Sequence, residues 1–538
     1  MNISGLTAQV KEFVSGLPGK PNASFVSSAA AEKRSRVFGI PVRTGGINFS
    51  SFQKVPSTAQ TVYIDAGGEN NAFATQKKKD IGASLERTLQ ELFAYLSACP
   101  LIYSDGSLGK GSGFSASCRL FVSSYRPESV HLCHMFSLMT FPGKGAPDLT
   151  VICIPEWSEK DRQVLVFSGI GVTFILGSDY FGEVRSAFLR MALSLSPDPG
   201  LHASAKIMTV EDAEGALKKI GIVFFGISST GKTTHACHDH GFRRHHEKMH
   251  ILQDDLLFWQ KDGMMAGAEN GFYIRTDRLG PISQPVLWKA ANSPGAVLEN
   301  VVVDYQGRPL FEDKTVAACG HGVIPFDVLS GPEGGGINMP PPRELDRMIF
   351  FFMTKNFTVV PVLSRLNREQ AAVCYMLTEP FDAVGSEIGK LDGRGGVSAV
   401  EVGRGNAKND VDEFYARLTE YPGIECYLLN IGGVGELVDT GLDGGRRILQ
   451  KVNRFSVSEI SIVIRSVLRG TVKWTDDKNW MCRVPSSIEG LDVSRFDPYS
   501  YYDQSRIDML VYAVRSERRA FAARFEGIDK KIIDSIEG

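Results

Sequence analysis

The spacing of apolar residues predicts mixed helices and strands in the first part of the chain. In residues 83–98, ASLERTLQELFAYLSA, leucines recur every three or four positions, which is typical of an amphipathic helix. Strand-like apolar runs occur at 61–67, 100–106, 118–124, 147–155 and 162–177, and Gly, Pro and Asp residues separate them. A second helix is expected over 180–195. These elements predict one α/β domain, residues 1–215.

A different pattern begins at residue 219, where short β-rich runs predominate. They lie at 219–226, 250–259, 271–276, 296–304, 347–354 and 357–366. The stretch LSGPEGGGINMPPP, residues 329–342, is expected to be a surface loop because Gly and Pro sustain neither a helix nor a central strand. Helices are expected over 458–470 and 503–527. The second predicted domain is residues 216–538.

Composition limits the possible partners. The 538 residues include 61 acidic and 59 basic side chains, so no nucleic-acid-binding surface is expected to cover the molecule. No apolar window is long enough for a membrane span, and the first residues lack the pattern of a signal peptide. The nine cysteines are scattered singly, which is typical of reduced thiols in a cytoplasmic protein.

Residues 226–233, GISSTGKT, match the phosphate-binding pattern G-x-x-x-x-G-K-[ST]. Glycines allow successive backbone N–H groups to point at phosphate oxygens, Lys232 can reach the β- and γ-phosphates, and the Thr233 hydroxyl can bind a divalent metal. The apolar run in front predicts a strand, and KTTHACHDHG can begin a helix whose positive end faces the anion. This context indicates a P-loop rather than an accidental glycine turn.

Two acidic residues follow this loop. Asp254 and Asp255 end an apolar run 22 residues beyond Lys232. Considered alone, adjacent aspartates at a strand end more often form a solvated turn. After a P-loop they are expected to be carboxylates that hold the metal of a phosphoryl-transfer site.

The strand, the loop and the Asp-Asp pair together resemble those of the ATP-dependent phosphoenolpyruvate carboxykinases. GLHASAK, residues 200–206, is similar to the family's MHCSAN motif. Further segments resemble family motifs in the same order, at 147–157, 175–188, 296–304, 357–371, 382–389 and 426–436. The similarity covers roughly four-fifths of the chain, so it is identified as a divergent member of this family.

The resemblance implies a two-domain α/β fold of the phosphoenolpyruvate carboxykinase type, with mixed sheets, a P-loop nucleotide-binding C-terminal domain and the active site in the cleft. It implies ATP and Mg²⁺ as cofactors, with Mn²⁺ as the usual second metal. The implied reaction converts oxaloacetate and ATP to phosphoenolpyruvate, ADP and CO₂. The implied triphosphate-binding residues are Gly226, Ile227, Ser228, Ser229, Thr230, Gly231, Lys232, Thr233 and Thr234.

The same resemblance assigns further roles. The residues implied in catalysis are Lys232, Asp254, Asp255, His202, Arg185 and Tyr180. The implied metal ligands are Thr233 for Mg²⁺, and His202 and Asp255 for the second metal. Arg275 and Arg454 fall at positions where the family has cations that contact the nucleotide. Without the family context, His202 would more often be a core or surface histidine.

Three departures from the family pattern concern the acid-binding and metal-binding side. Ser186 stands where the family has a lysine that binds the second metal, and a hydroxyl is a weaker ligand. His321 stands where the family has an arginine that neutralises the transferring phosphoryl group. The family's oxaloacetate-binding arginine in GRSPKDK has no clear counterpart, since the nearest candidate, residues 74–80, contains no arginine.

Three functions therefore fit the sequence. The first is a divergent phosphoenolpyruvate carboxykinase, which would form phosphoenolpyruvate from oxaloacetate and ATP. The second is a kinase of the same fold that acts on another small acceptor. The third is a regulatory protein that binds ATP with little turnover. The oligomeric state is not predicted.

Six of the ten histidines lie within residues 235–250. They could chelate a transition metal, but their spacing fits no standard zinc pattern. We expect a polar insertion near the nucleotide.

Overall fold

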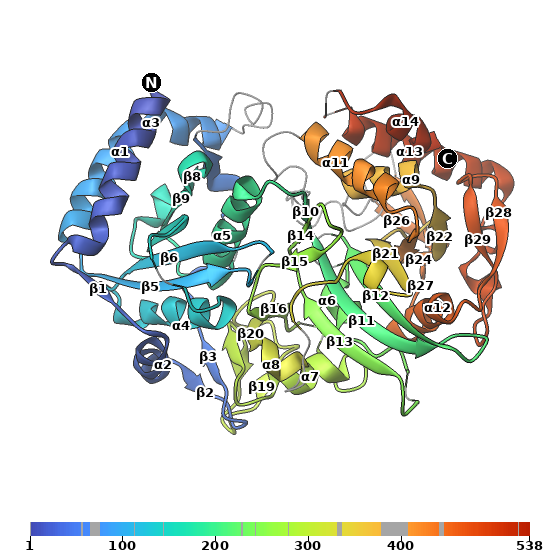
Figure 1. Cartoon of the computed structure of the whole chain (residues 1–538), viewed down its shortest axis with the longest axis horizontal. Helices are drawn as coiled ribbons and strands as arrows, with labels where there is room; N and C mark the ends of the chain where they lie inside the picture. The colour runs from blue at the N-terminus through green and yellow to red at the C-terminus, as the bar shows by residue number, and fades with distance from the viewer. Residues whose placement is uncertain are drawn as a thin grey trace. The chain divides into compact units, whose positions relative to one another are not determined.

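The computed structural model describes residues 2–54, 57–64, 76–111, 113–143, 145–226, 230–242, 244–277, 279–330, 336–377, 407–440, 446–523, 525 and 527–537 (Figure 1). The chain forms two compact units. Unit 1 comprises Met1–Pro197 and Gly267–Glu333, and unit 2 comprises Asp198–Ala266 and Gly334–Gly538. This division differs from the single boundary expected near residue 215, because residues 267–333 pack with the N-terminal residues.

Unit 1 contains a seven-stranded mixed sheet. Its strands, in spatial order, are β1 (Ala23–Phe25), β5 (Leu101–Leu108), β6 (Ala116–Ser123), β7 (Leu149–Ile154), β9 (Val172–Leu176), β8 (Gln163–Phe167) and β4 (Thr61–Tyr63). The strands expected at 100–106, 118–124 and 147–155 are confirmed, and the run expected at 61–67 begins with β4, while its residues 65–67 lie outside the described residues. The single run expected over 162–177 is two antiparallel strands, because the chain turns at Gly171 with a φ of 64°.

A second sheet of unit 1 joins its two stretches of chain. It contains β16 (Gly271–Arg275), β20 (His321–Pro325), β17 (Val297–Glu299), β3 (Ile47–Phe49) and β2 (Ile40–Pro41). A two-stranded ribbon pairs β18 (Val302–Val303) with β19 (Pro309–Leu310). The helices are α1 (Ile3–Gly16), α2 (Ser28–Ser35), α3 (Gln76–Ala98), α4 (Val130–Met139), α5 (Phe181–Leu195), α7 (Pro285–Ala291) and α8 (Phe326–Ser330). The helices expected over 83–98 and 180–195 are thus confirmed as α3 and α5.

Unit 2 is built on an eight-stranded mixed sheet. Its order is β13 (Lys248–Gln253), β11 (Ala203–Glu211), β12 (Leu217–Phe225), β21 (Arg347–Thr354), β23 (Ile424–Asn430), β22 (Leu363–Leu366), β29 (Cys482–Ser487) and β28 (Lys473–Asp477). The small sheets contain β10 (Gly200–Leu201), β14 (Leu257–Trp259) and β15 (Met265–Gly267); β24 (Gly433–Val434) and β27 (Asn453–Arg454); and β25 (Leu437–Thr440) and β26 (Arg446–Gln450). The helices are α6 (Lys232–Ala236), α9 (Arg368–Leu377), α11 (Ala407–Glu420), α12 (Val457–Arg469), α13 (Gln504–Ala522) and α14 (Lys530–Asp534).

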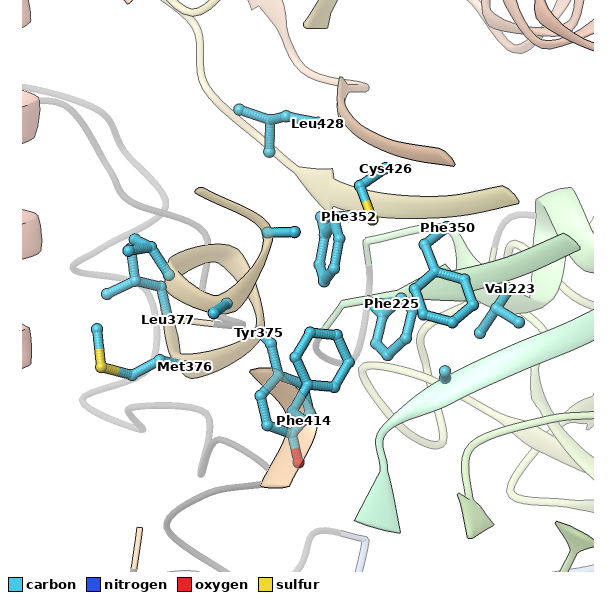
Figure 2. Packing of buried hydrophobic residues seen from close by; sticks show 14 of the residues in the cluster. Val223, Phe225, Phe350, Phe352, Tyr375, Met376, Leu377, Phe414, Cys426 and Leu428 are labelled. Atoms are coloured by element: carbon cyan, nitrogen blue, oxygen red, sulfur yellow. The ribbon is translucent and has the colours of Figure 1, made fainter. Parts of the chain in front are cut away.

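The central strands of unit 2 are buried on both faces. Strand β12 runs parallel to β21, and β21 runs parallel to β23. On one face Phe225 stacks on Phe352, with ring centroids 4.7 Å apart, and Tyr375 stacks on Phe414 at 4.1 Å (Figure 2). Burial on both faces explains why these strands read as continuous apolar runs in the sequence.

Within the described ranges, no helix is both long enough and apolar enough to cross a bilayer. The nine cysteines are all unpaired.

Candidate active site

The glycine-rich loop, residues 226–233, follows directly from a central strand. Strand β12 ends at Phe225, and Gly226 takes a φ of 152°, where an added Cβ atom would lie 2.4 Å from the Thr230 Oγ1 atom. Gly231 has a φ of 81°, which favours glycine over other residues. Ile227, Ser228 and Ser229 lie outside the described residues. The strand expected before the loop is confirmed, whereas the helix after it, α6, has only five residues.

Three side chains from separate segments meet beside this loop. The Lys232 ammonium is 4% exposed, and its nitrogen lies 3.1 Å from the His202 Nε2 atom and 3.5 Å from the Asp255 Oδ1 atom. The His202 Nε2 atom lies 3.2 Å from the same Asp255 oxygen. A lysine, an imidazole and a carboxylate therefore converge in unit 2.

Asp254 points to different partners from those of its neighbour. Its Oδ2 atom accepts a 2.8 Å hydrogen bond from the Thr233 hydroxyl, and its Oδ1 atom accepts one from the Ser204 hydroxyl. Asp255 adopts a φ of 71°, which is uncommon for a residue with a side chain. This turn of the backbone sends the two adjacent carboxylates in different directions.

Burial and neighbouring charges set the protonation of this cluster. Burial raises the pKa of Asp254 above its usual value, and the adjacent Asp255 carboxylate raises it further. Burial lowers the pKa of His202, and the nearby Lys232 ammonium acts in the same direction. The His202 imidazole is therefore held neutral, which is the form that binds metals.

The donors in this cluster fit a hard divalent cation. Asp255 offers a carboxylate, His202 a neutral imidazole and Thr233 a hydroxyl, and such oxygen and nitrogen donors suit Mg²⁺ and Mn²⁺. Throughout the part of the chain that the structure describes, no three His, Cys, Asp or Glu side chains group to hold a metal ion. A metal here would therefore take further ligands from phosphate oxygens or water.

Arg454 belongs to the same unit as the loop. Ile431 lies close to the loop, since an added Cβ atom at Gly231 would lie 3.6 Å from its side chain. Gly433, two residues after Ile431, pairs with Arg454 between β24 and β27. The Arg454 guanidinium is exposed and lies 5.0 Å from the ring centroid of Phe357.

A second polar cluster lies in unit 1, where α5 begins. The Tyr180 hydroxyl lies 3.4 Å from both ring nitrogens of His321. The His321 ring stacks on Tyr273, with centroids 4.8 Å apart and planes inclined by 4°. Burial lowers the pKa of His321 to about 3, and the charge of Arg275 adds to this effect. At neutral pH, His321 therefore supplies no positive charge.

Arg185, one turn into α5, is paired with a buried carboxylate. Its Nε atom donates a 2.7 Å hydrogen bond to the Glu269 Oε1 atom, and its Nη2 atom bonds the other Glu269 oxygen. The two side chains are 7% and 2% exposed. Arg275 lies in the same unit and forms a two-point ion pair with Asp277, at 3.1 Å for each hydrogen bond.

Glu299 connects the beginning of α5 to the second sheet. Its two carboxylate oxygens accept hydrogen bonds, each 2.9 Å long, from the Phe181 N–H and the Tyr273 hydroxyl. Burial raises the pKa of Glu299 to about 8, so the carboxyl group is held mainly protonated at neutral pH.

Lys54 is a member of this cluster that the sequence did not indicate. Its ammonium donates to the Asn300 Oδ1 atom at 2.9 Å and to the Ser51 carbonyl. Asp179 fixes the preceding residues, because its carboxylate accepts the N–H groups of Phe52 and Gln53 at 2.7 and 2.9 Å. Lys54 belongs to no motif in the sequence, and the strand before it, β3, was not among the strands expected from the sequence.

Comparison with known proteins identifies the family. The model of the phosphoenolpyruvate carboxykinase family matches residues 67–494. The chain belongs to the phosphoenolpyruvate carboxykinase family. The match includes the glycine-rich loop, the Asp-Asp pair, His202 and the whole of the Tyr180–Arg185 segment.

Similar curated proteins carry the same family name. A phosphoenolpyruvate carboxykinase (ATP) of Aeropyrum pernix is 28% identical over 398 residues, which is 73% of this chain and 75% of the relative. Another, from Rhizobium leguminosarum bv. trifolii, is 26% identical over 409 residues, covering 73% of this chain and 70% of the relative. These identities are consistent with a divergent member of the phosphoenolpyruvate carboxykinase family.

The departures from the family motifs have specific surroundings in this member. His321 is neutral, stacks on Tyr273 and meets the Tyr180 ring edge-on, while Arg275 is its direct neighbour across the β16–β20 ladder. Ser186 lies on α5 next to the paired Arg185. Among the described residues of unit 1, Lys54, Arg185 and Arg275 are cations at or near this cluster.

The histidine-rich segment is partly folded around polar contacts. His240 lies in a left-handed backbone conformation, and its imidazole contacts the His235 carbonyl and the Ser461 hydroxyl at 3.1 and 3.3 Å. His246 pairs with Glu211 at 2.8 Å. These imidazoles make hydrogen bonds within the protein, and the polar insertion near the nucleotide stays a prediction.

Proposed function

We propose that this protein converts oxaloacetate and ATP to phosphoenolpyruvate, ADP and CO₂. The observation that carries the proposal is the convergence of Lys232, His202 and Asp255, which come from three separate segments. Family membership favours this reaction over a kinase with another acceptor or a regulatory protein without turnover.

In this proposal, residues 226–234 form a P-loop that binds the triphosphate of ATP. Lys232 neutralises charge on the β- and γ-phosphates, and the Thr233 hydroxyl, oriented by Asp254, binds the nucleotide-associated Mg²⁺. His202 and Asp255 hold a second divalent cation, for which Mn²⁺ is our expectation. When bound, the metals neutralise developing charge on the phosphate and enolate oxygens. Arg454 and Arg275 are proposed contacts of the nucleotide.

The cluster in unit 1 is proposed to bind the acid. Tyr180, Lys54 and Arg185 offer a hydroxyl and two cations, which suit a dicarboxylate. Glu269 holds the Arg185 guanidinium in one orientation, so its position does not depend on the substrate. The scattered, unpaired thiols support a cytoplasmic location as part of the proposal.

The test is direct detection of product. Purified protein is incubated with oxaloacetate, ATP, Mg²⁺ and Mn²⁺, and ³¹P NMR measures phosphoenolpyruvate and ADP. We expect both products to form in equal amounts and to require oxaloacetate. Omission of Mn²⁺ measures how far product formation depends on the second metal, which is proposed to bind His202 and Asp255. Hydrolysis of ATP without phosphoenolpyruvate, with both metals present, would contradict the proposal.

A further inference from the structure

One strand contributes three contacts to the region around the glycine-rich loop. Alternate residues of a strand face the same way, so Ser204 and Lys206 of β11 share a face, and His202 precedes them in the same alternation. His202 lies beside Lys232, and Ser204 donates to Asp254. Lys206 continues this row one step further along the strand.

Lys206 is completely buried, yet its ammonium makes two strong contacts. The nitrogen donates 2.7 Å hydrogen bonds to the backbone carbonyls of His235 and His238, and it lies 5.5 Å from the Phe224 ring centroid. These carbonyls belong to the last turn of α6 and the loop that follows it. Carbonyls at a helix C-terminus lack partners within the helix, so a buried cation there satisfies them.

Nothing in the proposed reaction uses this lysine. It stands at the last position of GLHASAK, where the similar family motif MHCSAN ends in asparagine. The donor nitrogen of an asparagine side chain lies two atoms closer to the backbone, so the contact to both carbonyls depends on the lysine of this chain. Burying an amine is costly unless hydrogen bonds compensate, which points to a specific role.

We propose that Lys206 is a positioning residue for nucleotide binding. By holding the His235 and His238 carbonyls against β11, it fixes helix α6, which carries Lys232 and Thr233 at its beginning. This inference rests on the proposed function, because it assumes that the loop binds ATP. Lys206 itself does not touch the nucleotide.

The contacts do not depend on the charge of the amine. Burial lowers the pKa of Lys206 to about 7, while the charges of Cys237 and Asp239 oppose this shift. The neutral amine and the ammonium both carry at least two N–H groups, and two carbonyls accept from them. The arrangement is therefore preserved on either side of neutrality.

The experiment compares Lys206→Met with a control from the same strand face. Methionine keeps the length and removes the donors, whereas Met208→Ala removes apolar volume from a buried side chain further along β11. Hydrogen exchange of the amides of residues 235–240 is measured without nucleotide. Equilibrium binding of MgATP is measured by calorimetry. Lys206→Gln, which keeps a donor, is the second variant and serves if Lys206→Met does not fold.

Loss of two buried hydrogen bonds is expected to weaken MgATP binding about 10-fold and to speed exchange at residues 235–240 in Lys206→Met. Lys206→Gln is expected to recover part of both losses, and Met208→Ala to leave binding within about 2-fold of wild type. Unchanged exchange, unchanged binding, or an equal loss in Met208→Ala overturns the inference. If wild-type protein binds no MgATP, the proposed function fails as well. If wild type and Lys206→Met bind MgATP equally well, only the positioning role is overturned.

Discussion

Two adjacent aspartates illustrate how much one backbone angle contributes to this site. Asp254 is buried and bonded to two hydroxyls, while Asp255 reaches Lys232 and His202. The positive φ of Asp255 costs about 1–2 kcal/mol in a residue with a side chain. Strain of this kind is concentrated at functional sites, where the surrounding structure holds it in place. The strained backbone at Asp255 therefore keeps the two carboxylates on different partners within the site.

Lys232→Met tests the central residue of the cluster. The variant loses the ammonium that reaches the phosphates, so MgATP affinity is expected to fall roughly 100-fold, in line with loss of a charge-assisted contact. Calorimetric titration with MgATP measures the change. Lys473→Met, on an exposed position of β28, is the matched control and should bind as wild type does. Equal affinity of Lys232→Met and wild type would exclude this lysine from the nucleotide site.

At the scale of elements, α5 and the strands beside it hold the unit 1 cluster together. Arg185 on α5 is paired with Glu269, and the N–H of Phe181 at the helix start is bonded to Glu299 of β17. Both partners lie in the second stretch of unit 1, far along the chain. The orientation of Tyr180 and Arg185 therefore depends on residues that no local pattern connects with them.

Single and double substitutions at the buried Arg185–Glu269 ion pair are expected to differ in how much unfolding free energy they cost. Arg185→Met leaves the Glu269 carboxylate buried without its guanidinium, which typically costs 3–5 kcal/mol of unfolding free energy, so roughly that loss is expected. Arg185→Met combined with Glu269→Gln removes both charges and should cost less. Urea unfolding followed by circular dichroism measures both. An equal loss in the single and double variants would show that the charge pairing is not the cause.

Glu299 predicts a pH dependence of stability. Its pKa is about 8 in the folded protein and 4.5 ordinarily, so the folded state keeps a proton that the unfolded state has lost. The stabilisation is complete below pH 4.5 and is lost as the pH rises through 8, at up to about 1.4 kcal/mol per pH unit.

The measurement compares wild type and Glu299→Gln between pH 6.5 and 8. The melting temperature of wild type is expected to fall more steeply with pH than that of the variant. His321 has the opposite sign, since its folded pKa of about 3 lies below 6.5 and its contribution is lost only as the pH falls below 6.5. Lys206, whose pKa of about 7 also lies in this window, is present in both proteins, so the difference between them isolates Glu299. Parallel melting curves for the two proteins would show that Glu299 does not titrate there.

On the scale of the whole molecule, each compact unit is assembled from two separated stretches of chain. Strand β3 near the N-terminus pairs with β17, about 250 residues away, in the register Ile47–Val297 to Phe49–Glu299. Two of the three points at which the chain passes from one unit to the other lie beside strands of one three-stranded sheet, because β10 and β15 flank β14 there. A cut at a single position therefore cannot release either unit intact.

Fragments test this organisation. A fragment of residues 1–215 lacks β17 and Glu269, so it is expected to show no cooperative thermal transition. A fragment that joins Met1–Pro197 to Gly267–Glu333 by six Gly and Ser residues restores β17 and Glu269. A linker of this length is sufficient, because β10 and β15 are about 10 Å apart across one intervening strand. Calorimetry distinguishes the two fragments. A sharp transition in residues 1–215 would show that the second stretch is dispensable.

The local chemistry of this protein could be predicted from its residues in order. The helix of residues 83–98, the buried strand before Gly226 and the glycine-rich loop follow from periodicity and from the conformations that glycine permits, which depend on neighbours along the chain. The order of motifs was sufficient to identify the family. The histidine, lysine and aspartates of the loop region were indicated by the same motifs.

What depended on folding was which distant residues share a surface. Lys54 is hydrogen-bonded to Asn300, Arg185 to Glu269 and Lys206 to the end of α6. No spacing of residues along the chain indicates these contacts. The assignment of residues 267–333 to unit 1 has the same origin. Long-range pairing is governed by burial and by the need of buried polar groups for partners, and these are properties of the assembled core rather than of any local segment.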